Sequence, residues 1–504
     1  MSGAARRITR RQALAEALAG AGALALAGCG TDGGRQAAVT GSTLESTWVD
    51  PLGVGMLQVG PGEPLIARTE LGAAARATGV IATLAHVADA HVLDASSPAR
   101  VAFLDRLGPP FQSTFRPHET LTAQVLAGMA RSVRALGPDA VIQGGDLIDN
   151  AQSNELIHAL AALRGGEVSP GSGRYGYYGV QLPSNADPFY YRPDLDAPRH
   201  PGLLGRAVRP FRSVGVPGPV YPVLGDHDIL VAGEVAPTPE TRALALGERA
   251  LWEPPPGLSA PPANQLTTTG STDGPPRPEL VSQFLAEAIA GPTVNVPADP
   301  ERRQLGVADA VGRLGPPIGA RRAGRDTLDY TVDLSPQLRL IVLDLARRDG
   351  GSGGLVRPEQ PGWLEAQLAA DTDRWVVVVS HQPLPSSTGG EQILALLDRS
   401  PRVVAALSGH IHRNLIEPRP TSAGGYWLIS TASLIDYPQQ ARGLRVVATR
   451  GGGVAIQTWM LDHVFRGDLG TISRGLAYLD AQGGRPQGFI GSRLDRNVTL
   501  HRAA

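Results

Sequence analysis

Five short clusters of aspartate and histidine stand out in the chain because their side chains can ligate metal ions. They are Asp89-Ala90-His91, Gly144-Gly145-Asp146, Gly225-Asp226-His227-Asp228, Ser380-His381-Gln382 and Gly409-His410-Ile411-His412. Carboxylate and imidazole ligands together suit Mn, Fe or Zn, and two such ions a few Å apart can share one bridging carboxylate. Each cluster alone is a weak signal, since a Gly-Asp pair is usually a turn and a single histidine is usually a core residue. Together they predict a two-metal site.

Each cluster follows a short apolar run of the kind found in strands that are buried on both faces. The runs cover residues 79–88, 140–142, 220–224, 375–379 and 403–407. Apolar faces with helical spacing lie between them, for example Leu121, Val125 and Met129. This alternation predicts an α/β fold, in which ligand sites form outside the carboxyl ends of strands. Further strands, with hairpin-like spacing at the end, are predicted at residues 328–334, 338–345, 426–431, 444–448 and 454–461, which makes the sheet region mixed.

The same patterns divide the chain into four parts. We predict an export signal at residues 1–29, a tether and irregular lead-in at 30–77, one α/β domain at 78–465 and a C-terminal extension at 466–504. Residues 151–217 and 231–326 show no core-sized pattern and are interpreted as insertions over the core. The tyrosine-rich stretch at 175–191 is compatible with a stacking wall for a nucleobase or sugar, or with packing of the insertion on the core.

Composition excludes several kinds of chemistry. The chain has 504 residues with 42% hydrophobic side chains, enough for a large core. Its 46 basic residues are all arginines and are matched by 47 acidic ones, so a lysine nucleophile is excluded and no basic field is expected for a nucleic-acid polymer. Its one cysteine, Cys29, excludes disulfides and thiolate metal clusters within one chain.

The N-terminus has the pattern of an export signal. Arg10 and Arg11 precede an apolar run from Ala15 to Ala27 that is too short to be a stable transmembrane anchor. The arginine pair resembles a twin-arginine signal, although Ala13 takes the place of the usual Phe. Residues 26–29, Leu-Ala-Gly-Cys, resemble a bacterial lipoprotein box, which implies lipidation at Cys29. We therefore expect the twin-arginine export machinery as a partner and a location on the outer face of the cytoplasmic membrane; the alternative is a cleaved signal and a secreted protein.

Taken in order, the five clusters resemble the signature of the calcineurin-like metallophosphoesterases. The resemblance covers roughly residues 78–465 without the insertions, and it implies a four-layer αββα sandwich of two mixed β-sheets flanked by helices. It implies ligand roles for seven residues: Asp89, His91 and His412 at a first metal, Asp226, His381 and His410 at a second, and Asp146 bridging both. His227 takes the place of the family's acid or phosphate-stabilising histidine, and Asp228 is expected to orient it.

The activity implied by this resemblance is hydrolysis of a small phosphate ester by a hydroxide that bridges two metal ions, with Mn or Fe favoured and Zn possible. Diesters are expected slightly ahead of monoesters. Asn150, Arg413 and Asn414 adjoin the clusters and are candidate substrate contacts. The alternative is a non-catalytic metal-binding scaffold on the same fold. Scaffold relatives are expected to lose ligands, whereas all eight positions here hold competent residues.

Two departures from the family pattern bear on the chemistry. Asp226 stands where the family usually has Asn, and its extra negative charge would disfavour monoester dianions more than diesters; a silent exchange is an equal alternative. Asp149 stands where purple acid phosphatases carry a tyrosine, so a ferric-tyrosinate site is not expected. Asp149 and Asn150 are instead expected to line the pocket or cap the next turn.

Overall fold

The computed structural model describes residues 41–107, 114–174, 176–258, 265, 267, 277–288, 290–316, 319–370, 373–483 and 488–504. They belong to one compact unit, Val39–Ala504. The predicted export signal, Cys29 and Tyr175 lie outside the described residues. Within the described part of the chain, no helix is long and apolar enough to cross a membrane.

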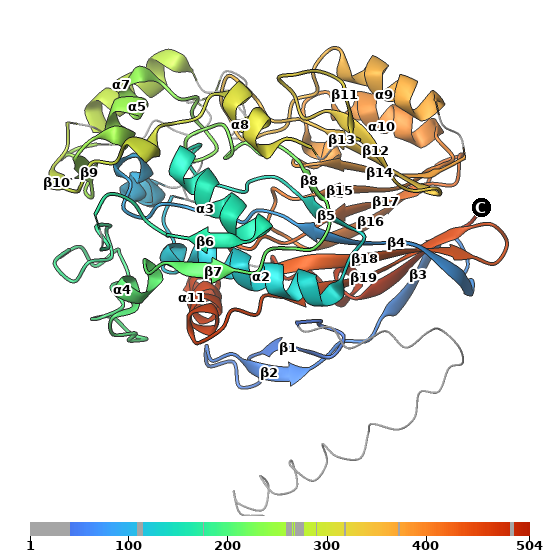
Figure 1. Cartoon of the computed structure of the whole chain (residues 1–504), viewed down its shortest axis with the longest axis horizontal. Coiled ribbons are helices and arrows are strands. Elements are labelled where there is room, and N and C mark those ends of the chain that lie inside the picture. Colours follow the sequence, from blue (N-terminus) through green and yellow to red (C-terminus); the bar gives the residue numbers. More distant parts are fainter. Residues whose placement is uncertain are drawn as a thin grey trace, which may run out of the picture. The chain divides into compact units, whose positions relative to one another are not determined.

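Two seven-stranded mixed sheets form the centre of the molecule (Figure 1). Sheet 1 has the order β3 (Ile66–Leu71), β20 (Val498–Arg502), β19 (Val454–Asp462), β18 (Gln440–Thr449), β4 (Ala77–Val87), β5 (Ala140–Gln143) and β8 (Val220–Pro222). Sheet 2 has the order β11 (Arg321–Arg322), β12 (Tyr330–Ser335), β13 (Leu338–Leu343), β14 (Trp375–Ser380), β15 (Val403–Ser408), β17 (Tyr426–Ser430) and β16 (Leu415–Arg419). Strands β4, β5 and β8 run parallel in sheet 1, as do β13, β14, β15 and β17 in sheet 2.

Helices cover the outer faces of both sheets and complete four layers. Successive side chains of a strand point to opposite faces, so Val377 and Val379 of β14 join the large core that includes both sheets, while Val376 and Val378 pack under α9 (Gln360–Ala369) and α10 (Gly390–Arg399). On sheet 1, α2 (Thr122–Leu136) and α3 (Ser153–Arg164) contribute to the large core. The predicted αββα architecture is confirmed.

The domain boundaries differ from the prediction in four places. Helix α3 lies in the first expected insertion and α8 (Val307–Leu314) in the second, yet both bury side chains in the large core. Strand β3 of the expected lead-in and β20 of the expected C-terminal extension pair with each other inside sheet 1. These elements are short and carry small or alternating polar side chains, so their sequences show no long apolar run. The α/β unit therefore extends from β3 to β20.

The rest of the two insertions consists of short elements, most of which pack in small hydrophobic clusters together with neighbouring parts of the chain. They are β6 (Gly166–Val168), α4 (Leu203–Ala207), β7 (Phe211–Ser213), α5 (Pro239–Leu246), β9 (Arg249–Leu251), α7 (Pro278–Ala288), β10 (Thr293–Asn295) and the 3-10 turn Pro300–Arg302. Tyr190 is fully buried and its hydroxyl donates to the Trp252 carbonyl at 2.8 Å. It packs with Phe115, which follows the 3-10 turns Pro98–Arg100 and Ala102–Leu107. Tyr190 therefore serves the packing of the insertion and does not form a stacking wall for a ligand.

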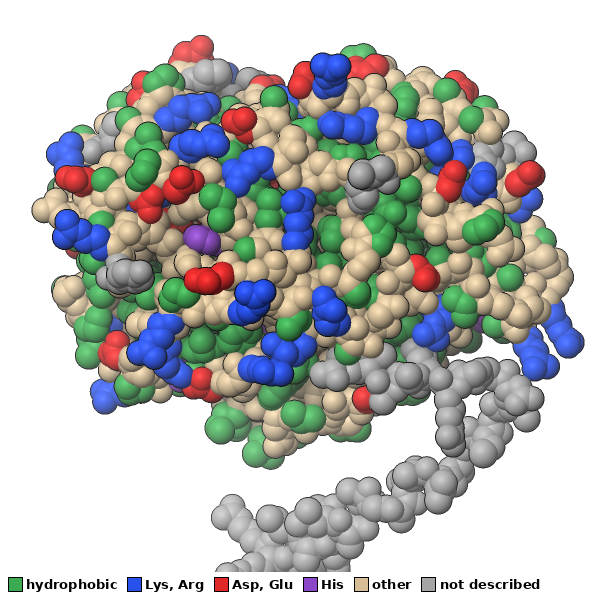
Figure 2. Space-filling view, in the orientation of Figure 1, with side chains coloured by type: hydrophobic (Ala, Val, Ile, Leu, Met, Phe, Trp, Pro, Cys, Tyr) green, Lys and Arg blue, Asp and Glu red, His purple; other side chains and the backbone are tan. Residues whose placement is uncertain are grey.

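Three further features complete the surface. The hairpin β1 (Ser46–Val49) and β2 (Gln58–Pro61) precedes sheet 1, and α11 (Leu469–Gly483) follows β19. Short 3-10 turns lie at Glu119–Leu121, Leu384–Ser386 and Arg493–Asp495. Arginine side chains are spread over the face shown in Figure 2, with acidic side chains between them.

Candidate metal centre

The five clusters lie at the carboxyl ends of parallel strands, as predicted. They follow β4, β5 and β8 in sheet 1 and β14 and β15 in sheet 2. The turns are tight: five of the seven expected ligands have left-handed φ angles, namely Asp89 (53°), His91 (42°), Asp146 (47°), His410 (67°) and His412 (54°). This region is sparsely populated by residues with a Cβ, and such outliers concentrate at functional sites.

Glycines within the clusters let these turns approach one another closely. A Cβ added to Gly145 would lie 2.2 Å from Nδ1 of His381, and one added to Gly409 would lie 2.5 Å from Oδ2 of Asp89. A Cβ on Gly225 would lie 2.1 Å from Oδ1 of Asp146. The glycines of the sequence clusters are therefore required by the site and not only by the turns.

Asp89, His91 and His412 form the first group expected to ligate a metal ion. One donor atom from each lies within 4.8 Å of the others. Nε2 of His412 is 3.2 Å from Nε2 of His91 and 3.5 Å from Oδ1 of Asp89. The residues come from the ends of β4 and β15, so the group joins the two sheets.

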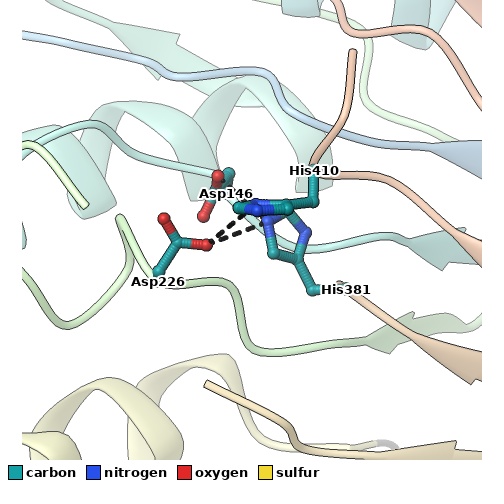
Figure 3. Close-up of side chains that lie close together, drawn as sticks. All are labelled: Asp146, Asp226, His381 and His410. Carbon is teal, nitrogen blue, oxygen red and sulfur yellow. Dashed lines mark ion pairs between the residues drawn. The ribbon is translucent and has the colours of Figure 1, made fainter. Parts of the chain in front are cut away.

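Asp146, Asp226, His381 and His410 form the second group (Figure 3). Nε2 of His381 lies 3.0 Å from Oδ2 of Asp146 and 3.2 Å from Oδ1 of Asp226. Nδ1 of His410 lies 3.4 Å from the same Asp226 oxygen. Oδ2 of Asp146 is also 3.6 Å from Nε2 of His91 in the first group. Asp146 thus occupies the position between the groups that a bridging carboxylate requires.

The pattern of hydrogen bonds fits bound cations. Nδ1 of three imidazoles faces an oxygen acceptor at 2.6–2.9 Å: His91 faces Asp149, His412 faces Asp436 and His381 faces the Gly144 carbonyl. With the proton on Nδ1, each Nε2 presents a lone pair to the space that holds the carboxylates. Buried Oδ2 atoms of Asp89 and Asp226 have no hydrogen-bond partner there. Facing lone pairs repel one another, and divalent cations between them would remove that repulsion.

The charges of the residues also fit bound cations. Burial favours neutral imidazole, but the carboxylates of Asp146 and Asp149 outweigh it and raise the pKa of His227 to about 10. Burial opposes ionisation of Asp89, yet the neighbouring His412 lowers its pKa to about 2. Neighbouring carboxylates also outweigh burial at His381 and His412 and raise the pKa of both, whereas burial lowers the pKa of His91. Bound cations would compete with the protons on His381 and His412.

His227 lies beside both groups without belonging to either expected ligand set. Its backbone N–H donates to Oδ1 of Asp146 at 2.9 Å, and its Nδ1 faces the Asp149 carbonyl at 2.9 Å. Its Nε2 lies 3.8 Å from Oδ2 of Asp226. The side chain is 10% exposed. Nε2 is thus the atom available to exchange a proton with a bound molecule.

The expected role of Asp228 is wrong. Its carboxylate accepts the backbone N–H groups of Leu147 and Ile148 at 2.9 and 3.2 Å and that of Gly225 at 2.9 Å. It therefore ties the turn after β8 to the turn after β5. Asp149 supports His227 instead, through its carbonyl and through Oδ1, which lies 3.3 Å from Nδ1 of His227. Adjacency in sequence misled the prediction, because the side chains of neighbouring residues in this turn point to different partners.

Two of the three candidate substrate contacts lie buried among protein partners. Asn150 is fully buried and donates to Asp149 and Glu155. Asn414 is fully buried, accepts from the Ala432 N–H and Arg442, and donates to the Ile490 carbonyl. Asn414 satisfies buried polar groups with both amide atoms, whereas the buried Oδ1 of Asn150 has no hydrogen-bond partner among the described residues. Contact of either residue with a substrate stays a prediction. Arg413 is exposed and stays a predicted substrate contact.

The supporting roles of the residues around the ligands were not predicted from the sequence. Asp436 follows the predicted strand at 426–431 by a few residues, so its place after an apolar run was a usable signal. Gln382 adjoins His381, and its Nε2 donates to Oδ1 of Asp226 at 2.9 Å. Arg100 and Arg116 lie in the loop before α2, where no pattern marks them.

No protein-family model matches the chain, and no curated protein matches its sequence. Among solved structures, the chain is similar to a dimetal phosphatase from Danio rerio, with 14% identity and a TM-score of 0.38 over 76% of this chain and 99% of that one. It is also similar to the sulfate thiohydrolase SoxB from Thermus thermophilus, solved in complex with glycerol, with 13% identity and a TM-score of 0.29 over 82% of this chain and 62% of that one. Both TM-scores are low, so the functional assignment depends on the geometry of the site itself.

Proposed function

We propose that the protein is a metal-dependent phosphoric ester hydrolase of the calcineurin-like metallophosphoesterase type. The observation that carries this proposal is the convergence of two groups of buried or half-buried aspartates and histidines on the shared carboxylate of Asp146. Divalent ions held by these groups, Mn or Fe in the first place and Zn in the second, would polarise the phosphoryl oxygens and supply a hydroxide nucleophile near neutral pH.

The protein's own residues would provide positioning and proton transfer. Asp149 and Asp436 fix the rings of His91 and His412 through Nδ1, so that Nε2 keeps one direction. His227 would donate a proton from Nε2 to the departing alkoxide or stabilise the negative charge of the transition state. Its ring is held for this by the Asp149 carbonyl.

A phosphodiester substrate is favoured over a monoester. Asp226 adds a negative charge next to His381 and His410, and this charge repels a monoester dianion more strongly than a diester. The hydrogen bond from Gln382 reduces this charge only in part, because the amide is neutral. Asp226→Asn should therefore raise the activity on monoesters relative to that on diesters. An unchanged ratio of the two activities would contradict the argument that the charge of Asp226 favours a diester.

A location outside the cytoplasm is proposed from the N-terminal sequence. We propose export through the twin-arginine machinery and lipid attachment at Cys29, which would hold the enzyme on the outer face of the cytoplasmic membrane. The motifs at Arg10, Arg11 and residues 26–29 support this proposal.

The deciding experiment measures Mn-stimulated hydrolysis of a phosphodiester and a phosphomonoester reporter by the full-length protein. Asp146→Ala should abolish turnover and lower the amount of bound metal. His227→Ala should lower turnover about 10²- to 10⁴-fold while metal binding persists. Ile157→Ser, on an exposed helix position, is the matched control. Metal binding without turnover of either reporter would favour the non-catalytic scaffold.

A further inference from the structure

The tip of the β1–β2 hairpin exposes an unusual number of large apolar side chains. Leu52, Val54, Met56 and Val59 are 79%, 61%, 74% and 65% exposed. The strands pair from Ser46 with Pro61 to Val49 with Gln58, so these residues surround the end of the hairpin. Hydrophobic side chains gather on the lobe that the hairpin forms at the bottom of Figure 2. Contiguous exposed apolar surface of this kind marks a place of interaction.

The chemistry of the tip suits an apolar environment. Residues 51–59, Pro-Leu-Gly-Val-Gly-Met-Leu-Gln-Val, include no charged side chain. The backbone N–H groups of Val54 and Gly55 donate to the carboxylate of Asp50 at 3.2 and 2.7 Å, and the Gly53 N–H donates to its carbonyl at 3.3 Å. These donors therefore need no water, and an unsatisfied donor would be costly to move into hydrocarbon.

The base of the hairpin is fixed to the body of the molecule. The hydroxyl of Tyr478 in α11 donates to Oδ2 of Asp50 at 3.2 Å. The guanidinium of Arg474 in the same helix lies over the Trp48 ring, 5.1 Å from its centroid. The tip is thus held by its base and by Gly55, where an added Cβ would lie 3.0 Å from Cδ2 of Leu479 in α11. The side chains of Leu52, Val54 and Met56 remain exposed.

We propose that this tip inserts into the headgroup and upper acyl region of a lipid bilayer. The inference rests on the membrane location proposed above. Gly41, the first described residue, follows Cys29 by 12 positions, so a chain anchored there reaches at most about 40 Å. A tether of this length keeps Gly41, which precedes β1 by five positions, within that distance of the membrane. Insertion adds apolar contacts that orient the protein on the surface, in the manner of other interfacial segments.

A second copy of the chain fits the tip less well. Stable protein interfaces need about 800 Å² and 20–30 residues from each partner, with polar groups at the rim. The tip offers nine residues, 51–59, and none of them is charged. A bilayer requires neither shape complementarity nor hydrogen-bond partners, so it accepts a small apolar projection.

The test uses a fluorophore that responds to its surroundings. Cys29 is the only cysteine, so Cys29→Ser in the full-length chain leaves none, and failure of this protein to bind vesicles would overturn the inference. An environment-sensitive label is placed at Met56→Cys and, as the matched control, at Leu195→Cys, which is 45% exposed in another loop. With phosphatidylcholine vesicles we expect a blue shift and quenching by a lipid-borne quencher at position 56 and neither at 195.

Further variants decide between the possible outcomes. Leu52→Ser with Val54→Ser should weaken vesicle binding on the order of tenfold, without dependence on salt, because the contact is apolar. Flotation with vesicles while the label at 56 stays in water would overturn the inference and leave the membrane location intact. A blue shift of the label at position 56 that grows with protein concentration in the absence of lipid would overturn the inference. It would indicate that the tip contacts a second copy of the chain instead of a bilayer. Hydrolysis of the reporters tests the enzymatic proposal separately.

Discussion

At the scale of single residues, the hydrogen-bond partner of Nδ1 fixes the direction of each imidazole ring in the site. Asp149 accepts from Nδ1 of His91 and also supports His227, so one carboxylate aligns an expected ligand and an expected proton donor. Asp436 aligns His412 in the same way, with its Oδ2 atom 2.6 Å from Nδ1 of His412. Supporting partners of this kind fix the tautomer and ring direction of metal-binding histidines.

Asp228 is expected to matter for stability more than for chemistry. In Asp228→Asn, the amide nitrogen would face a backbone N–H that the carboxylate now accepts, for example that of Gly225. We expect a loss of about 1–3 kcal/mol in the free energy of unfolding, measured by urea denaturation. Asp149→Asn should lower turnover more than Asp228→Asn. Loss of turnover with unchanged stability in Asp228→Asn would restore a direct role for this residue.

At the scale of elements, the loop before α2 supports the first metal group with two buried arginines. Arg100 donates to Asp149 and, at 2.7 Å, to Glu119. Arg116 donates to both oxygens of Asp436 at 2.6 and 3.1 Å. The arginines neutralise the carboxylates that orient His91 and His412. In the second group, by contrast, Nδ1 of His381 faces a backbone carbonyl.

Arg116→Met is therefore expected to weaken the binding of one of the two ions. Loss of the guanidinium leaves Asp436 buried without its cation, which disturbs His412, and we expect a 10- to 100-fold lower affinity for the ion of the first group. Equilibrium dialysis of Mn measures both sites. Arg502→Met is the control, because this buried arginine donates to the carbonyls of Pro401 and Gly425. An equal loss of affinity for both ions would contradict the assignment of Arg116 to the first group.

The contact of α10 with sheet 2 should depend on pH. Arg419 donates to both oxygens of Asp398 at 2.7 Å, and this pairing lowers the pKa of Asp398 below its usual 3.8. Because the pKa is lower in the folded state, the pair stabilises the protein above about pH 4 and its contribution is lost as the pH falls. Asp398→Asn should cost about 0.5–1 kcal/mol at pH 6. In chemical denaturation, that difference from the wild type should shrink toward pH 3; a constant difference would exclude ionisation as its cause.

At the scale of the whole molecule, the two sheets meet at the ligands. The first group joins β4 of sheet 1 to β15 of sheet 2, and the second joins β5 and β8 to β14 and β15. Bound cations would therefore link the halves of the sandwich as well as carry chemistry.

Removal of metal is expected to lower the melting temperature. An ion present at 100 times its dissociation constant stabilises the folded state by about 2.7 kcal/mol. Treatment with a chelator should lower the transition in a thermal scan, and Mn should restore it. Asp146→Ala, which lacks the shared carboxylate, should respond much less. A melting temperature that is insensitive to chelator would contradict metal binding by the native fold.

The sequence by itself predicted an α/β fold with five ligand clusters at the ends of apolar runs, and its resemblance to a known family implied the αββα architecture and the roles of the seven expected ligands. The fold class and the clusters depend on local patterns, because a buried strand is a continuous apolar run and a ligand cluster follows it directly. The tertiary structure alone decided which groups those ligands face. The packing of two turns places Asp149, not Asp228, beside His227, and Arg116 reaches Asp436 across 320 positions. It also decided that β3 and β20 belong to sheet 1 and that the hairpin tip is exposed, since pairing and burial depend on neighbours distant in sequence.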